Sequence, residues 1–402
     1  MSAVDNARRI APRRVPARRM NLTWSDPRLR SLVWQIVIVG VVAAVAWYLI
    51  SNTMRNLEAR HVATGFAFLG RIAGIPLSEA LLPYNPAVNT YGYALLIGVL
   101  NTAKVASVGI VLATILGTLI GIARLSRNWL MSRLAAAYVE LMRDIPVLLQ
   151  LLFWYMFLQN LPGPRQALHI GNLVFLCNRG IRFVLPMWQP AYGWAAAAFA
   201  AGLAVTLAWN HIARRRQDAT GVKPPVWPVA LALLAGAPLA VWAAFGAPFV
   251  PDYPALKGFN FQGGGDISPE YGALLTGLVI YTAAYIAENV RAGIQSVPHG
   301  QSEAAGALGL HRGMVLRLVT LPQALRVIIP PLTSDFLNLT KNSSLAVAIG
   351  FPDIVAVANT TLNQTGQAIE GITIIMAVYL TISLSISAFM NWYNAHIALV
   401  ER

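Results

Sequence analysis

The feature that most constrains this chain is a series of apolar runs, each long enough to cross a lipid bilayer. The run SLVWQIVIVGVVAAVAWYLI at 31–50 contains no acidic or basic side chain. At 1.5 Å of rise per residue, about 20 helical residues span a hydrocarbon core of about 30 Å. The chain is 56% hydrophobic and 11% charged, against about 45–50% and about 25% in soluble domains. The sequence therefore predicts an integral membrane protein.

The positive charge of the chain is gathered in clusters beside the apolar runs. The formal net charge is +14, and residues 1–30 carry eight arginines directly ahead of the run at 31–50. Arginine clusters of this kind orient membrane helices, so we exclude nucleic-acid binding. A cleavable signal peptide has a shorter apolar region and a small-residue cleavage site. We expect a basic cytoplasmic tail at 1–30, an uncleaved N-terminal anchor helix at 31–50, and membrane lipid as a partner.

Metal and redox chemistry have no support in the sequence. The single cysteine, Cys177, cannot form an intrachain disulfide. No CxxC or Cys/His set predicts a zinc site, and no histidine opens an HExxH motif. We therefore expect no metal and no cofactor on this chain.

Apolar runs and arginine clusters together predict the path of the chain through the membrane. The clusters at 124–133 and 214–216 fall between spans and mark the cytoplasmic side. The predicted fold class is an all-α integral membrane protein of about eight transmembrane helices, with both termini in the cytoplasm. The predicted spans are 31–50, 92–123, 134–160, 190–210, 226–248, 271–292, 323–349 and 370–397.

The segments between the spans complete this predicted organisation. Polar and proline-rich stretches are expected to form external loops at 51–91, 161–189, 249–270 and 350–369. The loop at 350–369 is partly apolar, and we leave open that it is a re-entrant or gating element. The membrane core then has a first part at 92–160 and a second part at 271–397. Between them lies an insertion at 161–270 with two extra transmembrane helices.

A cytoplasmic loop before the seventh span contains a predicted short helix. Residues 299–312 read HGQSEAAGALGLHR. We expect Ser302 or Gln301 to cap the helix, Glu303 to favour its positive dipole end, and Gly309 to stop it. Small residues on its surface would let another backbone approach closely, which favours a docking role. The alternative is an ordinary amphipathic loop helix.

A polar cluster interrupts the otherwise apolar span at 323–349. An ionisable residue at membrane depth is a functional hypothesis by default, and Lys341 could attract a substrate carboxylate. The alternative is that its stem snorkels along the helix or that it pairs with Asp335 or Glu370. The serines could equally be helix–helix contacts. The predicted substrate-path residues are Lys341, Asn342, Ser343 and Ser344.

Two further charged positions have simple structural interpretations. Glu288 and Arg291 are three residues apart on a predicted helix, so we expect them to pair with each other; a role in coupling stays open. Lys104 lies near the outer end of its span, and we expect it to snorkel.

The spacing around the short helix resembles a known transport motif. Glu-Ala-Ala at 303–305 is followed by Gly309 and then by Val-x-Leu-Pro at 319–322. This pattern is similar to the EAA loop of the membrane subunits of bacterial ATP-binding cassette importers, with Val319 where the family usually has Ile. The resemblance implies that the loop, here 299–322, contains a coupling helix that seats in a cleft of a cytoplasmic ATPase. It implies ATPase-coupling roles for Glu303, Ala304, Ala305, Gly309, Leu321 and Pro322.

The resemblance extends to the polar amino acid permeases of the histidine and glutamine uptake type. The similar segments include NTAKVASVGIVLATILGTLIGIARLSRN at 101–128, AAAYVELMRDIPVLLQLLFWY at 135–155 and LTKNSSLAVAIGFPDI at 339–354. Together with its anchor and insertion, the chain looks like the long first permease of the general L-amino acid or glutamate/glutamine/aspartate/asparagine systems. It departs from that family at 143–146, which reads RDIP where relatives often have RGTP. The resemblance implies a type I importer-like transmembrane domain.

This resemblance implies a transporter subunit of the bacterial inner membrane that is not itself an enzyme. The sequence has no G-x4-GK-[ST] loop and no Gly-Lys dipeptide, so a partner ATPase dimer would bind ATP and Mg²⁺. The other implied partners are a second homologous permease, a periplasmic amino acid-binding protein and the amino acid itself. We expect the insertion at 161–270 to contact the binding protein or the second permease.

Two other functions remain as alternatives. A secondary transporter of amino acids, driven by an ion gradient, would favour inverted repeats and acidic residues at mid-membrane. Asp and Glu total 16, and nearly all lie in predicted loops or near span ends. A membrane-anchored scaffold would not need the EAA-type spacing.

Overall fold

The structure is a computed structural model that describes residues 27–59, 64–222 and 224–397. It divides into two units, one up to Gly65 and one from Phe66 onward. The first unit contains α1 (Pro27–Ala59), whose stretch Leu29–Thr53 is apolar and of membrane length. The predicted anchor at 31–50 lies within α1. The predicted basic tail lies outside the described residues up to position 26.

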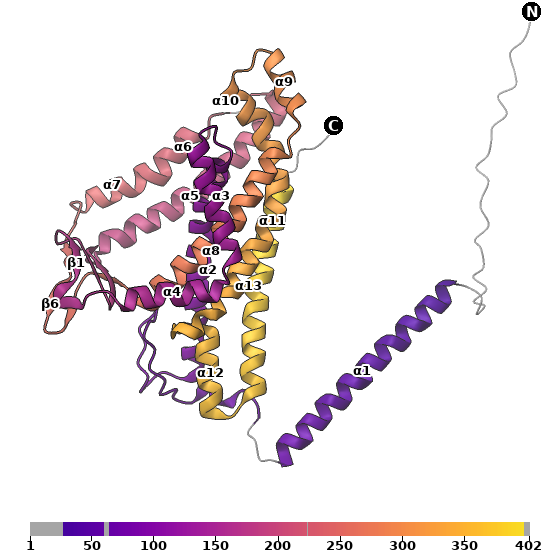
Figure 1. Ribbon diagram of the computed structural model, residues 1–402, viewed down its shortest axis with the longest axis vertical. Coiled ribbons are helices and arrows are strands. Elements are labelled where there is room, and N and C mark those ends of the chain that lie inside the picture. Colours follow the sequence, from indigo (N-terminus) through magenta and orange to yellow (C-terminus); the bar gives the residue numbers. More distant parts are fainter. Residues whose placement is uncertain (1–26, 60–63, 223, 398–402) are drawn as a thin grey trace, which may run out of the picture. The chain divides into compact units, whose positions relative to one another are not determined.

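The second unit is built around a bundle of long helices (Figure 1). Its central pair is α2 (Tyr91–Arg124) and α8 (Pro269–Gln295), which pack along much of their lengths. Each begins at a capping hydroxyl, because Thr90 accepts from the backbone N–H of Tyr93 and Ser268 accepts from that of Tyr271. The bundle is completed by α11 (Leu321–Asn342), η5 (Ser343–Ile349), α12 (Ile354–Thr365) and α13 (Ala368–Ile397).

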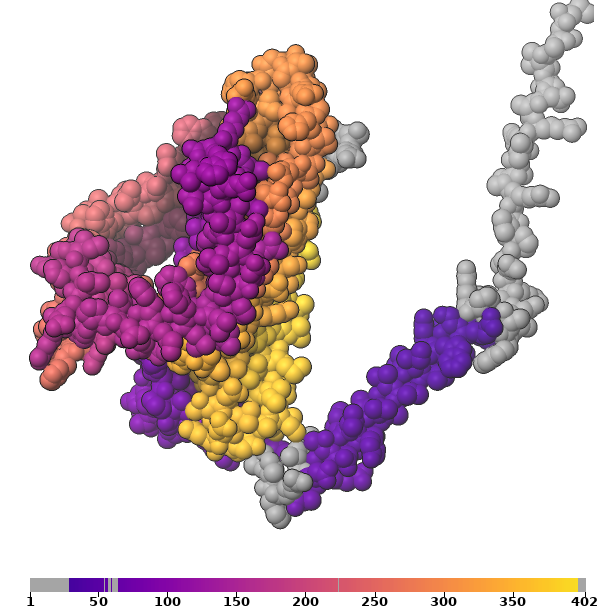
Figure 2. Space-filling model, in the orientation of Figure 1, coloured from indigo at the N-terminus to yellow at the C-terminus, as the bar shows by residue number. Residues whose placement is uncertain are grey.

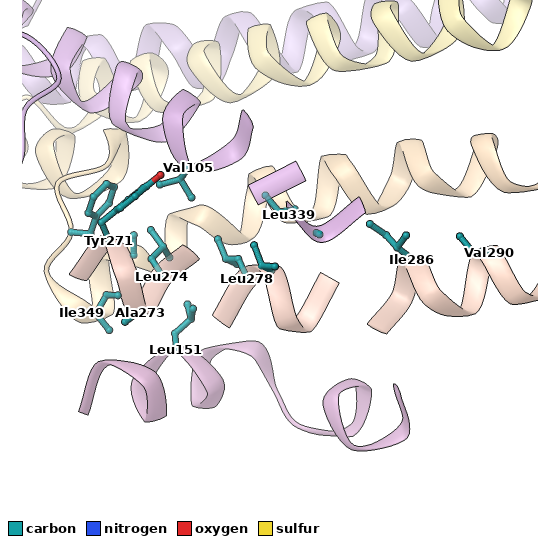
Figure 3. Packing of buried hydrophobic residues seen from close by; sticks show 14 of the residues in the cluster. Val105, Leu151, Tyr271, Ala273, Leu274, Leu278, Ile286, Val290, Leu339 and Ile349 are labelled. Atoms are coloured by element: carbon teal, nitrogen blue, oxygen red, sulfur yellow. The ribbon is translucent and has the colours of Figure 1, made fainter. Parts of the chain in front are cut away.

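Glycines allow α2 and α8 to approach each other closely. A Cβ atom added at Gly117 would lie 2.7 Å from the Cβ of Ile286, and one at Gly121 would lie 2.7 Å from the carbonyl oxygen of Ala287. Membrane helices use small residues in this way, because lipid gives them no hydrophobic reason to associate and packing must do so. Around this contact lies the buried apolar core shown in Figure 3, which includes Val105, Leu151, Leu274, Leu278 and Leu339.

The predicted span at 134–160 is not one continuous helix. This segment forms two helices, α3 (Trp129–Asp144) and α4 (Val147–Gln159), which meet at an angle of 103°. Pro146 lies at the bend, and the side-chain amide of Gln150 donates to the carbonyl oxygens of Met142 (2.9 Å) and Ile145 (3.0 Å). These bonds satisfy carbonyl groups that the broken helix leaves free. The described residues contain seven membrane-length helices, or eight if this bent pair is one span.

The two helices of the insertion pack against each other as a hairpin. They are α5 (Pro190–Thr220) and a broken helix made of α6 (Trp227–Leu231), the π-turn η3 (Ala232–Gly236) and α7 (Ala237–Ala244). Gly202 allows a close approach, since a Cβ there would lie 2.4 Å from the carbonyl oxygen of Leu233. The predicted spans at 190–210 and 226–248 therefore exist as helices, with α5 ten residues longer.

The segments of the insertion that we predict as loops contain short β-strands instead. Strands β1, β2, β3 and β8 form a four-stranded antiparallel sheet in that order, while β4 pairs with β5 and β6 pairs with β7. The sheet joins chain segments on both sides of the α5–α7 hairpin, so local sequence could not reveal it. The strands are β1 (Leu168–Ile170), β2 (Val174–Cys177), β3 (Gly180–Phe183), β4 (Leu185–Pro186), β5 (Pro251–Asp252), β6 (Ala255–Lys257), β7 (Asn260–Gln262) and β8 (Gly265–Ile267).

A second apolar cluster holds the segment before α2 against the bundle. Phe68, in the short helix η1 (Phe66–Gly70), is buried with Tyr91 of α2 and with Ile354 and Val357 of α12. The predicted external turn at 350–369 is thus largely a helix, α12, which packs on α2 and α13. Its N-cap is Asp353, whose carboxylate accepts from the backbone N–H of Ala356 at 2.8 Å.

Candidate coupling helix and membrane pocket

The predicted short cytoplasmic helix exists as α9 (His299–Ala307). Its N-cap is Pro298 and no side chain caps it, so the prediction of Ser302 or Gln301 as the cap is wrong. The prediction that Gly309 stops the helix is confirmed, because Gly309 has a left-handed φ of 78°. Two reversed hydrogen bonds close the end, from Gly309 N–H to Gly306 O (2.9 Å) and from Leu310 N–H to Ala305 O (3.2 Å). This pair of bonds is a Schellman motif.

One face of α9 is open and carries small side chains. Glu303 and Ala304 are exposed, while Ala305 is buried against the rest of the loop. Leu308, directly after the helix, is 82% exposed. Figure 2 shows α9 and α10 at one end of the second unit, in orange. This end of the second unit therefore presents an exposed surface of mostly small side chains.

The turn after α9 leads into a helix that continues into the bundle. α10 (Arg312–Val315), the π-turn η4 (Leu316–Thr320) and α11 follow one another without a break. Leu321 and Pro322 form the first turn of α11, so they do not end the helical segment as the loop boundary at 322 implies. Proline has no N–H to donate, and immediately before it the N–H of Leu321 donates five residues back to Leu316 O. The π-turn accommodates this proline.

A cavity of about 290 Å³ lies between α8 and α11, within the bundle. The hydroxyls of Tyr281 and Tyr285 lie 3.1 Å apart, and the guanidinium of Arg143 stacks 5.0 Å from the ring of Tyr285. The carboxylate of Asp335 accepts from the side-chain amide of Asn289 at 2.6 Å. The cavity is lined by Tyr281, Thr282, Tyr285, Asp335, Asn338 and Asn342. The cavity thus has one carboxylate, two carboxamides and three hydroxyls for a polar ligand.

Of the four predicted path residues, the structure places Asn342 alone in the lining of this cavity. Lys341 is exposed, and Asp335, one of the partners we suggest for it, bonds to Asn289 instead. The hydroxyls of Ser343 and Ser344 donate to the carbonyl oxygens of Thr340 and Lys341, each at 2.7 Å. These bonds are local, and both hydroxyls also form side-chain hydrogen bonds with Tyr379 of α13, which supports the alternative that the serines are helix–helix contacts.

Sequence reasoning missed most of the cavity lining, although a signal was present. Asp335, Asn338 and Asn342 are spaced at i, i+3 and i+7, which places them on one helical face. Lys341 is one residue away from Asn342 and falls on another face. Tyr281 and Tyr285 are similarly four residues apart on α8.

The predicted pairing of Glu288 with Arg291 is confirmed, at 2.5 Å. The structure adds a third member, because Arg124 at the end of α2 also forms an ion pair with Glu288. Arg291 in turn donates to the side chain of Gln295 at 2.5 Å. This network joins the last turns of α2 and α8 near α9.

The prediction that Lys104 snorkels is wrong. Its ammonium lies 2.5 Å from the carboxylate of Glu79 and 4.1 Å from the ring centre of Tyr271. Glu79 also accepts from the hydroxyl of Ser268 at 2.7 Å. A nearby opposite charge held by the preceding segment is a better partner than distant water.

A bundle of membrane-length helices with an exposed short helix at one end fits a membrane-embedded subunit, and the comparison with known families gives its class. The family described as "Binding-protein-dependent transport system inner membrane component" matches residues 109–398, and this chain belongs to that family. The matched range includes α9 and the whole of α11.

Several relatives are similar over nearly their whole length. The chain is 49% identical to the putative amino-acid ABC transporter permease protein YhdX of Escherichia coli, covering 95% of this chain and 98% of the relative. It is 48% identical to the general L-amino acid transport system permease protein AapQ of Rhizobium johnstonii, covering 94% of each. The glutamate/glutamine/aspartate/asparagine transport system permease protein BztB of Rhodobacter capsulatus is 41% identical over 96% of this chain and 97% of the relative.

Among solved structures, one of an amino acid ABC transporter with histidines aligns with a TM-score of 0.44 and 22% identity. The alignment covers 76% of this chain and 95% of the other.

Proposed function

We propose that this chain is the permease subunit of an ATP-driven amino acid importer and that α9 couples it to a separate ATPase. The relatives YhdX and AapQ are amino acid permeases by name, and they match this chain from end to end. The observation that carries the proposal is the continuous helix from Arg312 to Asn342, which runs from the turn after α9 to the membrane cavity.

The coupling residues have distinct proposed roles. Glu303 and Ala304, on the open face of α9, contact the ATPase, and the small side chain of Ala304 allows a close fit. Ala305 is buried and seats α9 on its own loop. Gly309 makes a turn that requires a left-handed backbone conformation, which glycine adopts without strain. Leu321 and Pro322 start α11 directly after the π-turn.

Motion at α9 reaches the cavity through rigid elements. When two ATPase subunits close on ATP, a helix held in a cleft of each moves with them. The segment from α10 to α11 then carries that motion to Asp335, Asn338 and Asn342. ATP shifts the inward and outward states only through its differential affinity for them. A loosened α9 would therefore uncouple hydrolysis from transport.

The cavity suits a free amino acid, which carries one positive and one negative group. In this proposal the carboxylate of Asp335 receives the substrate ammonium, because a charge at membrane depth needs an opposite partner. The carboxamide N–H groups of Asn338 and Asn342 can donate to the substrate carboxylate. The rings of Tyr281 and Tyr285 form an apolar and hydroxylated wall for the side chain. In the proposed substrate site, Asp335 and Asn338 take the place of Lys341, Ser343 and Ser344, which do not line the cavity.

The remaining components follow from the same proposal. ATP and Mg²⁺ bind to a cytoplasmic ATPase dimer, and a second homologous permease pairs with this chain. A periplasmic binding protein delivers the amino acid from the outer side. The chain lies in the bacterial inner membrane with both termini in the cytoplasm, which puts α9 on the ATPase side.

The experiment is uptake of labelled amino acids into liposomes that contain the chain with its ATPase dimer, second permease and binding protein. The proposal predicts uptake that requires ATP on the ATPase side and survives ionophores that collapse ion gradients. Liposomes with this chain alone should show no uptake. Uptake that stops with the ionophore and continues without ATP would establish the secondary transporter instead.

A further inference from the structure

The four-stranded sheet of the insertion has one apolar face. Its strand register places Leu168, Leu176, Ile181 and Ile267 side by side across β1, β2, β3 and β8. The next row on the same face is Ile170, Val174, Phe183 and Gly265. Neither row contains a polar side chain.

The opposite face of this sheet is different in character. Because side chains alternate across a strand, His169, Phe175, Arg182 and Asp266 form the row that points the other way. Arg182 and Asp266 lie 3.6 Å apart as an ion pair, and Phe175 stacks 4.7 Å from Phe261 of the β6–β7 hairpin. The sheet is therefore amphipathic, with a charged side and an apolar side.

The apolar face is covered at one end and open at the other. Ile267, on β8, packs against the core cluster of the bundle, close to the start of α8. At the far edge, on β1, Leu168 is 54% exposed and Ile170 is 74% exposed. The apolar surface thus extends outward from the membrane bundle. Soluble surfaces rarely leave such a continuous patch open without a partner.

This sheet leads directly into the α5–α7 hairpin, since β3 ends at Phe183 and α5 begins at Pro190. Hydrogen bonds close the open end of that hairpin. The backbone N–H of Met187 donates to Val250 O at 2.8 Å, which joins the segments leading to α5 and from α7. Pro248 O accepts from the hydroxyl of Tyr192 on α5 (2.8 Å) and from the indole of Trp242 on α7 (3.3 Å). In Figure 1 the strands lie at the end of the α5–α7 hairpin. The sheet therefore lies within a few residues of the end of this membrane-length hairpin.

Exposed aromatic and apolar side chains surround this junction. Trp188 is 76% exposed, Phe249 is 63% exposed and Met187 is 48% exposed. Tryptophan and other amphipathic rings gather at the level of lipid headgroups. Their position marks the junction as a membrane–water boundary, with the apolar face of the sheet beginning beside it.

We propose that the apolar face of this sheet lies on the outer leaflet of the membrane, with Leu168 and Ile170 against phospholipid. Its edge strand β1 has unpaired backbone groups, which cannot enter hydrocarbon without cost. The backbone therefore stays at the hydrated headgroup level while the two side chains reach the acyl boundary, as in interfacial helices. The opposite face lies away from the lipid, with the β6–β7 hairpin over Phe175, the Arg182 side chain 17% exposed, and Asp266 59% exposed. A binding protein that docks and leaves is a poorer occupant, since transient interfaces are more polar than this face.

The test uses nitroxide spin labels in the assembled transporter in phospholipid liposomes. Cys177 is the single cysteine of the chain, so Cys177→Ser with cysteine-free partner subunits gives a background for one label at a time. Ile170→Cys reports the apolar face, and His169→Cys, the next residue along β1, is the matched control on the other face. Collision rates are measured with oxygen, which concentrates in lipid, and with a neutral nickel chelate, which stays in water.

The proposal predicts that oxygen reaches the label at position 170 several-fold better than nickel does, and that the preference reverses at position 169. Leu168→Cys repeats the measurement on the apolar face if Ile170→Cys does not assemble. Nickel access at 168 and 170 equal to that at 169 would place the face in water. Low access to both reagents would show that another protein subunit covers it. Either result would overturn the proposal.

Discussion

The ammonium of Lys104 lies 2.5 Å from the carboxylate of Glu79, although the two residues belong to different elements. Lys104 is on α2, and Glu79 is in the segment that precedes it. Both side chains are mostly buried, at 28% and 18% exposure. Because Glu79 also bonds to Ser268 at the start of α8, the pair fastens this segment to both central helices of the bundle.

Removing one member of this ion pair should lower the stability of the transporter more than removing both members. Glu79→Ala leaves the charge of Lys104 partly buried and without its ion-pair partner, and we expect the stability of the folded transporter to fall by about 1–3 kcal/mol. Glu79→Ala with Lys104→Met should lose less, because no unpaired charge remains. The measurement is the apparent melting temperature of the purified transporter for each variant. Additive losses in the double variant would show that the two charges do not interact.

The contact between α2 and α8 should not tolerate larger residues at its glycines. Gly117→Ala would force its added Cβ into Ile286 and the backbone at Ala283, and overpacking of this kind costs about 1–3 kcal/mol. We expect reduced assembly and a lower melting temperature. Gly236→Ala is the matched control, since a Cβ there meets no atom closer than 4.0 Å. Equal behaviour of the two variants would contradict the packing that the structure shows.

The carboxylate of Asp335 should determine substrate affinity. Asp335→Asn keeps the shape of the side chain but removes the charge that we assign to the substrate ammonium. A hydrogen bond to a charged group is worth about 1.5–3 kcal/mol, so we expect KM for uptake to rise about 10- to 100-fold. Asp218→Asn makes the same chemical change at an exposed position on α5 and should leave KM unchanged. An unaltered KM in Asp335→Asn would contradict the assignment of this carboxylate to the substrate ammonium.

Stability should depend on pH through Asp353, which lies outside the membrane-length helices. Burial raises the pKa of this carboxyl to about 7 from 3.8. Between about pH 4 and pH 7 the folded chain holds the proton and the unfolded chain does not, so stability is highest below pH 4 and falls as pH rises through 7. Asp353→Asn cannot ionise but keeps an N-cap acceptor. Its melting temperature should change less between pH 5 and pH 8 than that of the unmodified chain, and an identical change would exclude this assignment.

The membrane spans could be predicted because their signal is local. Twenty apolar residues in sequence, as at 31–50, have few alternatives to a membrane helix. The stop at Gly309 could be predicted for a similar reason, since a left-handed turn favours glycine at one position. Glu303 and Ala304 then come from spacing and resemblance, and their exposure on α9 fits both.

Features that depend on distant parts of the chain could not be predicted. Pro146 marks a break, but the 103° bend depends on bonds from Gln150 and on the packing of α4 against α8. The pairing of β3 with β8 joins Ile181 to Ile267 across the whole α5–α7 hairpin. The partner of Lys104, Glu79, lies in a segment with no periodic pattern.

The cavity was partly accessible to sequence reasoning. Asp335, Asn338 and Asn342 share one face of a helix by spacing alone. A lysine in an apolar segment is the more obvious candidate for a substrate site because it is rarer there. Lys341 is nevertheless exposed and does not line the cavity. Helical periodicity is therefore the better guide to which polar residues in a span face the same space.

The central claim is that α9 transmits the motion of the ATPase subunits to the membrane cavity. The variant Ala304→Trp tests this claim most directly. The bulky ring on the open face of α9 should prevent close docking, while Ala196→Trp on exposed α5 is the control. In the reconstituted transporter, uptake per ATP hydrolysed should fall about tenfold or more in Ala304→Trp, equivalent to about 1.4 kcal/mol of lost coupling, and stay unchanged in Ala196→Trp. Normal uptake per ATP in Ala304→Trp would contradict the account.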